Sequence, residues 1–400
     1  MRRTVGLLAA VCATVAATGV ALADSQPTAR SVAAPVVRSG PRVGTVESVT
    51  GLIERQGKLV GGKKELTYSY PGASYVKVHF SKWALREGDR VTVSDPSGAE
   101  SYTYTVPESL NDSWAMSITG DTAVVRLEQG SYDPLGLRTR LAGLGIGVDK
   151  VARGFPTEQI GEDAAPRNPH RSGREESICR GGDEKRNAVC YKAANPVAYK
   201  RAQAVPRMLI DGVELCTAWR WGPNNRLMTN NHCISNSYEV RHSEIWFGYE
   251  CGTCGGSDTG RSTKVYGDRL IAVDQTLDYA LFSVTGFEAI QRFGYLEMDP
   301  NPARAGQELY IPQHPRGLPT MIATADPGER NGNCAVDNPS YYGYAANTDI
   351  SYYCDTEGGS SGSPVISASS HKVVALHHFG GCPNSGVRMD LIYDEVGRLL

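Results

Sequence analysis

The stretch GGSSGSP, residues 358–364, decides the fold, because its three serines stand among glycines and a proline closes the run. A flexible linker has a similar composition. However, residues 365–367 continue as a strand, and residues 373–376 predict another. A tight Gly/Ser loop between two strands of one domain is poor placement for a linker. The stretch is therefore interpreted as the loop of a hydrolase, and the question becomes which serine attacks.

Two serines compete for the role of nucleophile. If the motif is G-x-S-x-G, Ser360 attacks, and that architecture needs an acid and then a histidine later in the chain. No Asp or Glu lies between Ser361 and His377, so this order fails. If Ser361 attacks instead, a chymotrypsin-like barrel requires a histidine and then an aspartate upstream of it.

The upstream sequence supplies both partners. LMTNNHC contains His232 beside Cys233, and LDYALF places Asp278 directly before an apolar run. The separations are 278 − 232 = 46 and 361 − 278 = 83 residues, which suit a path around two small barrels. Asp274 competes with Asp278, but Asp278 adjoins the predicted strand and is preferred.

The chain from about residue 179 to 400 resembles secreted trypsin-like serine endopeptidases of the chymotrypsin fold, and in particular the bacterial lysyl and glutamyl endopeptidases. Four motifs carry the resemblance: CTAW…LMTNNHC (216–233), DYALF (278–282), CDTEGGSSGSPV (354–365) and ALHHFGGCPN (375–384). The resemblance implies an all-β catalytic domain, a chymotrypsin-like double β-barrel, with peptidase activity.

The resemblance assigns a role to each candidate catalytic residue. His232 takes the proton from Ser361 and returns it to the leaving amine, since imidazole has an ordinary pKa near neutrality. Asp278 fixes the tautomer of His232 and stabilises the imidazolium. Ser361 forms the acyl-enzyme. The backbone N–H groups of Gly359 and Ser361 form the oxyanion hole.

Two interpretations of the substrate pocket remain open. Asp355 lies six residues before Ser361, where trypsin-like enzymes that prefer basic residues hold an acid, and this favours Lys or Arg at P1. His377 resembles the histidine with which glutamyl endopeptidases bind a Glu side chain, and Gly380 and Gly381 complete the predicted pocket. We lean towards Lys or Arg. The alternatives are a Glu-specific endopeptidase and a catalytically inactive, protease-like binding protein.

Residues 1–23 predict an export signal, with two arginines at the start, an apolar stretch of small residues and an A-x-A cleavage site. We therefore expect a secreted, extracellular protein. Of ten cysteines, Cys12 leaves with the signal, and the other nine all lie from Cys179 onward. An exported chain is permitted to form disulfides, and an odd number leaves one cysteine over.

The cysteines give a partial disulfide scheme. Cys216 with Cys233 staples the loop that holds His232. The resemblance further implies three pairs: Cys179 with Cys382, Cys190 with Cys251 or Cys254, and Cys334 with Cys354. The lone C-x-x-C at 251–254 has no second pair at the spacing of a zinc site, so we expect no metal and no cofactor.

The N-terminal part predicts a second all-β domain. Residues 24–150 predict a small β-sandwich that is loosely similar to CUB-like jelly rolls, and 151–178 predict a linker and processing region. The expected strands are 43–53, 74–80, 90–94, 102–106, 114–119 and 122–127, with 227–229, 244–249, 279–284, 308–311, 364–367 and 372–377 in the catalytic domain. We expect a zymogen whose residues 24–177 form a pro-domain or accessory domain that is removed or displaced.

The bulk composition excludes several partners. The chain has 400 residues, 40% of them hydrophobic, with a net charge of −2 and a pI near 6.5. These values support packed cores and give no basis for a nucleic-acid partner. No segment predicts a stable membrane anchor. We expect a monomer that acts on protein or peptide substrates.

Overall fold

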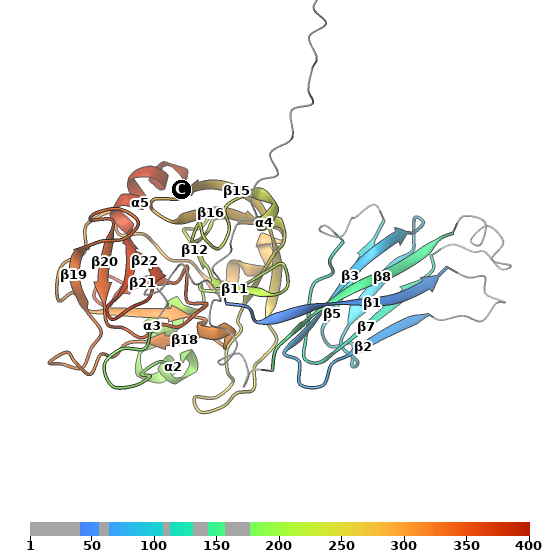
Figure 1. Ribbon diagram of the computed structural model, residues 1–400, viewed down its shortest axis with the longest axis horizontal. Helices are drawn as coiled ribbons and strands as arrows, with labels where there is room; N and C mark the ends of the chain where they lie inside the picture. Colours follow the sequence, from blue (N-terminus) through green and yellow to red (C-terminus); the bar gives the residue numbers. More distant parts are fainter. Residues whose placement is uncertain (1–40, 56–63, 107–112, 131–142, 157–176) are drawn as a thin grey trace, which may run out of the picture. The chain divides into compact units, whose positions relative to one another are not determined.

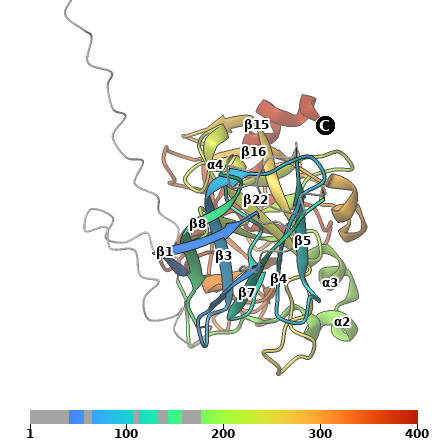
Figure 2. The same ribbon diagram turned by 90° about the vertical axis from the view of Figure 1, so that its right-hand side faces the viewer.

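Two antiparallel sheets of four strands each form the N-terminal domain, in the orders β1-β8-β3-β6 and β2-β7-β4-β5 (Figures 1 and 2). The computed structural model describes residues 41–55, 64–106, 113–130, 143–156 and 177–400. The strands are β1 (Gly44–Glu54), β2 (Glu65–Ser69), β3 (Tyr75–Ala84), β4 (Arg90–Ser94), β5 (Ser101–Thr105), β6 (Ile118–Thr119), β7 (Thr122–Glu128) and β8 (Gly145–Gly154). The predicted export signal and most of the predicted linker lie outside the described residues.

Side-chain alternation explains why these segments form a sandwich. In β4, Val91 and Val93 are fully buried while Thr92 between them is half-buried. This is the period of two that a strand with one buried face requires. The inward residues of both sheets pack into one apolar core that includes Val78 and Val125. The CUB-like relationship of this domain stays a prediction.

The end of the N-terminal domain differs from the sequence prediction. Neither β2 nor β8 was expected as a strand, and β8 continues to Gly154, beyond the domain boundary expected at residue 150. The glycines and charges of GIGVDKVARG weaken its strand pattern. β8 forms because it pairs with β1 on one side and β3 on the other along its length. Tertiary pairing here overrides a weak local preference.

A seven-stranded sheet forms the first half of the catalytic domain, in the order β11-β10-β14-β15-β16-β13-β12. Its strands are β10 (Arg207–Ile210), β11 (Glu214–Thr217), β12 (Trp219–Arg220), β13 (Leu227–Thr229), β14 (Ser243–Phe247), β15 (Thr263–Asp274) and β16 (Tyr279–Val284). The sheet encloses a core that includes Met208, Phe247 and Phe282. Predicted and observed bounds coincide for β13 and β16.

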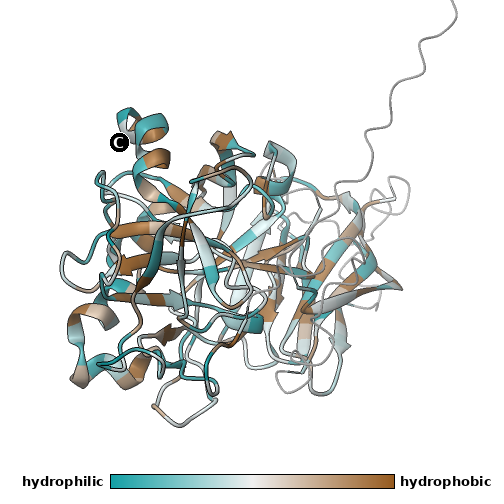
Figure 3. Cartoon of the chain, turned by 60° about the vertical axis from the view of Figure 1, so that its left-hand side comes forward, coloured by the Kyte–Doolittle hydropathy of each residue, from teal (hydrophilic) through white to brown (hydrophobic). Residues whose placement is uncertain are grey.

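An eight-stranded sheet forms the second half, in the order β19-β20-β23-β22-β21-β17-β18-β9. Its strands are β9 (Arg186–Asn187), β17 (Leu309–Gln313), β18 (Met321–Ala323), β19 (Val336–Tyr341), β20 (Asp349–Tyr352), β21 (Pro364–Ser367), β22 (Val373–Phe379) and β23 (Asn384–Arg388). Figure 3 shows hydrophobic colouring along many strands, as expected where their side chains fill cores.

The helices within the described residues are short. They are η1 (Ala188–Cys190), α2 (Tyr191–Ala194), α3 (Pro196–Ala202), α4 (Ser237–Arg241), η2 (Phe287–Phe293), η3 (Pro315–Gly317), α5 (Met389–Val396) and η4 (Gly397–Leu399). None of the helices in the described part of the chain is long and apolar enough to cross a bilayer. A shared core joins the two sheets and includes Met228 and Leu281 from the first and Ile366 and Val387 from the second. This shared core fixes the two sheets, and the loops at their ends, relative to each other.

Candidate active site

His232 and Asp278 meet at one end of the first sheet. His232 follows β13, and Asp278 immediately precedes β16, which pairs with β13. His232 Nδ1 lies 2.7 Å from Asp278 Oδ2, and the His232 backbone N–H donates to Asp278 Oδ1 at 2.9 Å. Asp278 itself adopts a left-handed φ of 42°. The Asn230 side chain donates to the Asp278 carbonyl at 2.9 Å and supports this turn.

A second histidine also contacts Asp278. His378 Nδ1 lies 3.0 Å from Asp278 Oδ2, and His378 Nε2 lies 2.6 Å from Asp349 Oδ2. Because both ring nitrogens face carboxylate oxygens, both must donate, and the ring is an imidazolium. Burial lowers the pKa of His378, but Asp349 and Asp278 outweigh it and raise the pKa to about 9.

These neighbours keep Asp278 ionised. Its side chain is 1% exposed, and burial by itself raises the pKa of a carboxyl group. The charges and hydrogen bonds of His232 and His378 outweigh burial and hold the pKa of Asp278 below its ordinary value. A buried carboxylate beside an imidazole is the arrangement that orients a histidine as a general base.

The serine loop (residues 358–363) precedes β21 and is held by Thr217 at the end of β11. The Thr217 backbone N–H donates to the Ser361 carbonyl at 2.8 Å, and the Thr217 hydroxyl donates to the Gly359 carbonyl at 2.8 Å. Gly359 has a φ of 100°, and a Cβ placed there would lie 2.5 Å from Leu215 Cδ2. Only glycine fits this position.

A disulfide joins β11, the strand that holds the serine loop, to the residue next to His232. Thr217, which binds Ser361, follows Cys216, and Cys216 is bonded to Cys233, the neighbour of His232. A sulfur of each cysteine and a ring nitrogen of His232 lie within 4.8 Å of one another. Since both sulfurs are in a disulfide, they supply no thiolate for a metal. The Thr217 hydrogen bonds and the Cys216–Cys233 bridge thus connect the serine loop, through β11, to the segment of His232.

The competing residues of the sequence analysis have other partners. The Ser360 hydroxyl is fully buried and donates to Gln313 Oε1 at 2.5 Å. Asp274 accepts the backbone N–H of Leu277 at 2.7 Å and so shapes the turn before β16.

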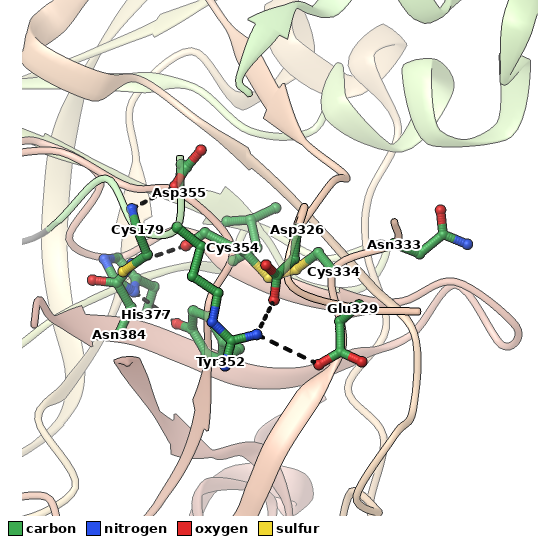
Figure 4. Close-up of a disulfide and its surroundings, with 12 residues drawn as sticks. Cys179, Asp326, Glu329, Asn333, Cys334, Tyr352, Cys354, Asp355, His377 and Asn384 are labelled. Carbon is green, nitrogen blue, oxygen red and sulfur yellow. Dashed lines mark hydrogen bonds and ion pairs between the residues drawn. A yellow bond between two sulfur atoms is a disulfide. The ribbon is translucent and has the colours of Figure 1, made fainter. Parts of the chain in front are cut away.

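Asp355 is placed differently from the expected pocket acid. It is 1% exposed, and one of its oxygens accepts the backbone N–H of Cys179 at 2.8 Å (Figure 4). Its other oxygen accepts the backbone N–H of Glu184 at 2.9 Å. Burial raises its pKa despite these hydrogen bonds. Asp355 thus anchors the segment that enters the catalytic domain. Its spacing from Ser361 predicted an acid in the substrate pocket, but the spacing does not show in which direction the carboxylate points.

The other predicted pocket residues lie on and after β22. His377 is fully buried, and its Nδ1 lies 2.7 Å from the Tyr352 hydroxyl (Figure 4). Burial, followed by the charges of His378 and His232, lowers the pKa of His377 to about 3, so it is neutral. Gly380 is buried, and the Gly381 N–H donates to the Ser177 hydroxyl at 3.1 Å.

Four disulfides occur in the described residues. They join Cys179 to Cys382, Cys190 to Cys254, Cys216 to Cys233, and Cys334 to Cys354. The alternative left open for Cys190 is thus resolved in favour of Cys254. Cys251 is buried and free among the described cysteines, which accounts for the odd one.

Sequence reasoning missed the part of the site around His378 and Asp349. The signal was present as the HH pair at 377–378 and the aspartate that begins DISYY. Nothing in those letters shows that β22 and β20 lie on either side of β23, which brings the two side chains together. Ser385 on β23 adds a hydroxyl that donates to Asp349 at 2.7 Å.

Residues 216–376 match the family described as the trypsin-like peptidase domain. The match includes His232, Asp278 and Ser361, and it confirms the predicted chymotrypsin-like fold. The chain is also similar to the "Secreted RxLR effector protein 73" of Plasmopara viticola, with 33% identity over 327 residues, 79% of this chain and 77% of the relative. The chain belongs to the same family as this relative. Residues 216–376 thus identify it as a peptidase of the trypsin-like class.

Solved structures of proteases resemble part of the peptidase. "Structure of Glu endopeptidase in complex with MPD" has a TM-score of 0.41 and 16% identity, and covers 55% of this chain and 97% of that one. "Crystal structure of Rv3671c protease, inactive form" has a TM-score of 0.38 and 15% identity, with 55% and 98% covered.

Proposed function

We propose that the peptidase is a serine endopeptidase that cleaves proteins or peptides through an acyl-enzyme on Ser361. The observation that carries the proposal is the contact of 2.7 Å between His232 Nδ1 and the buried Asp278. This contact leaves Nε2 of His232 as the nitrogen that can accept a proton. The serine loop is fixed nearby through Thr217 and the Cys216–Cys233 disulfide.

The chemical steps follow from these positions. Ser361 Oγ attacks the carbonyl carbon of the scissile bond while His232 Nε2 takes the hydroxyl proton. The tetrahedral intermediate collapses, and His232 gives that proton to the leaving amine. A water molecule then attacks the acyl-enzyme by the same route and releases the second product.

The negative charge that develops on the substrate carbonyl oxygen must be stabilised by hydrogen-bond donors. Backbone N–H groups of Gly359 and Ser361 are the proposed donors, and each such donor contributes about 3 kcal/mol to the lowering of the barrier. The glycine at 359 is required for this, because a side chain there would meet Leu215. Asp278 stays ionised throughout and stabilises the imidazolium of His232.

The preference at P1 is the second part of the proposal. The position of Asp355 in the sequence favoured Lys or Arg, but both of its oxygens accept backbone N–H groups. This favours the Glu-specific alternative, in which neutral hydrogen-bonding groups bind the substrate carboxylate. His377 is one such group. The Thr356 hydroxyl, buried and without a hydrogen-bond partner among the described residues, is another.

Digestion of a peptide library, read by mass spectrometry, tests both parts. The proposal expects cleavage that Ser361→Ala abolishes, with Glu enriched at P1. Enrichment of Lys or Arg would restore Asp355 as the selecting residue. If wild-type protein leaves the library uncut, the chain is an inactive, protease-like binding protein.

Secretion and removal of residues 1–23 also belong to the proposal. The name of the similar effector protein includes the word secreted, and four disulfides join described cysteines of this chain. Disulfides persist mainly in oxidising compartments. N-terminal sequencing of the protein from culture medium tests this, with Asp24 as the expected first residue unless the protein is processed further.

A further inference from the structure

The segment that leads into the β-sandwich pairs with an edge strand of the catalytic domain. The Val43 N–H donates to the Val213 carbonyl at 2.8 Å, and the Leu215 N–H donates to the Pro41 carbonyl at 3.1 Å. The segment runs antiparallel to β11, which is the outer strand of its sheet. Residues 41–43 thus supply the hydrogen-bonding partner that an edge strand otherwise lacks.

The same strand, β11, holds the serine loop two residues further on. Leu215 is fully buried and lies under Gly359, where a Cβ would approach Leu215 Cδ2 to 2.5 Å. Thr217 binds the Ser361 carbonyl through its N–H and the Gly359 carbonyl through its hydroxyl. One short strand therefore connects the N-terminal domain to the proposed oxyanion hole.

A buried carboxylate fastens the two domains together. The Glu244 side chain on β14 is 0% exposed and accepts from Lys77 Nζ. It also accepts from the Ser117 N–H at 3.0 Å, the Ser117 hydroxyl at 2.6 Å and the Trp246 indole N–H at 3.0 Å. Three of these four donors come from the β-sandwich.

A buried lysine repeats the pattern with the charges exchanged. Lys264 on β15 is 0% exposed at its side chain and lies 2.7 Å from Glu100 Oε1. It also donates to the Ser117 carbonyl at 2.9 Å and the Thr119 hydroxyl at 3.0 Å. All of these acceptors belong to the β-sandwich. The partners from the sandwich thus compensate the burial of both charges at this contact.

Apolar side chains complete the contact. Val43 and Tyr75 of the N-terminal domain form one buried cluster with Leu209, Leu215 and Trp246 of the catalytic domain. Without the sandwich these side chains would form an exposed apolar patch of the kind that isolated soluble domains avoid. The combination of a shared apolar core and paired buried charges is typical of a permanent interface.

We propose that the β-sandwich is a positioning domain. Because residues 41–43 pair with β11, the sandwich holds Leu215 and Thr217 against the serine loop. The Ser361 hydroxyl reacts efficiently only while the sandwich is docked. The proposal rests on the proposed function for its catalytic readout. It replaces the expectation that residues 24–177 are removed as a pro-domain. Cleavage within 157–176 leaves the sandwich bound to the catalytic domain.

The test uses full-length protein and Glu244→Gln, which keeps the size of the side chain but removes its charge. The matched control is Glu65→Gln, since Glu65 pairs with Arg126 on the exposed side of the sandwich. Val43→Pro is the second variant. It deletes the N–H that pairs with Val213 and leaves the buried charges untouched. Hydrogen exchange read by mass spectrometry follows residues 213–217 and 358–363, and a fluorophosphonate probe measures the reactivity of Ser361.

The proposal expects faster exchange in both segments and labelling that is slower by about tenfold or more in Glu244→Gln and Val43→Pro, with Glu65→Gln like wild type. The other barrel strands keep their protection. Faster exchange at 213–217 with unchanged labelling would overturn the coupling. Unchanged exchange at 213–217 in both variants would overturn the role of the interface. If wild-type protein takes up no probe, the proposed function fails. Hydrogen exchange at 358–363 then tests by itself whether the sandwich interface is coupled to the serine loop: faster exchange in the variants supports the coupling, and unchanged exchange overturns it.

Discussion

Replacing Asp349 with asparagine tests the charge network behind the proposed base. His378 is buried between Asp349 and Asp278, and its pKa is raised from 6.5 to about 9. A raised pKa means that the folded state binds the proton more tightly than the unfolded state. The resulting stabilisation is full below pH 6.5 and is lost as the pH rises through about 9.

The size of this stabilisation follows from the shift. The difference is 9 − 6.5 = 2.5 pH units, which corresponds to about 3 kcal/mol of unfolding free energy. Few other shifted groups titrate in this window. The pKa of His377 is lowered to about 3 and that of His314 to about 4, and the shifted tyrosines titrate above 10. The loss between pH 6.5 and 9 therefore reports mainly on His378.

Asp349→Asn removes the larger of the two charges that raise the pKa of His378. Urea unfolding at a series of pH values is the assay. We expect the variant to lose about 3 kcal/mol at pH 6.5, as when one partner of a buried ion pair is removed. Its further loss between pH 6.5 and 9 should fall to about 1 kcal/mol or less.

Glu329→Gln is the control, because Glu329 lies 3.9 Å from Arg180 and both side chains are about one third exposed. It should change the unfolding free energy by less than about 1 kcal/mol and leave the pH dependence of wild type intact. An equally steep alkaline loss in wild type and Asp349→Asn would refute the assignment of a charged His378 at this site.

Three further predictions concern the site and its loops. Asp278→Asn should lower kcat by about four orders of magnitude, measured with a peptide substrate, while an active-site ligand still binds; a loss of binding equal to the loss of rate would contradict an orienting role. Gly359→Ala should lower kcat/KM by about 10²-fold, because its Cβ would meet Leu215 Cδ2 at 2.5 Å; near-normal activity would move the oxyanion hole elsewhere. Replacing both Cys216 and Cys233 with alanine should cost about 3 kcal/mol in urea unfolding, since their bridge spans 17 residues; no change would show that the loop is held by its other contacts.

Local sequence signals placed much of the catalytic domain. The expected bounds of β13, β16 and β21 equal the observed ones, because each is a short apolar run bounded by turn residues. His232 and Asp278 are predicted to be catalytic because each adjoins one of these runs. The order of motifs along the chain then restricted the serine to position 361.

Contacts between residues far apart in the chain could not be predicted from the amino-acid sequence. Lys77 and Glu244 are separated by 167 residues, and no periodicity links them. Asp355 was expected in the pocket from its spacing to Ser361, but a carboxylate can turn towards a neighbouring backbone segment without any change in spacing. The link from Asp278 through His378 to Asp349 likewise depends on the order of strands in the second sheet.

Active-site labelling of the purified full-length protein addresses the central claim most directly. A fluorophosphonate should attach to one chain position, Ser361, as read by tandem mass spectrometry. His232→Ala should suppress the attachment, since the hydroxyl then has no base to take its proton. Attachment at Ser360, or equal attachment in wild type and His232→Ala, would contradict a histidine-activated Ser361.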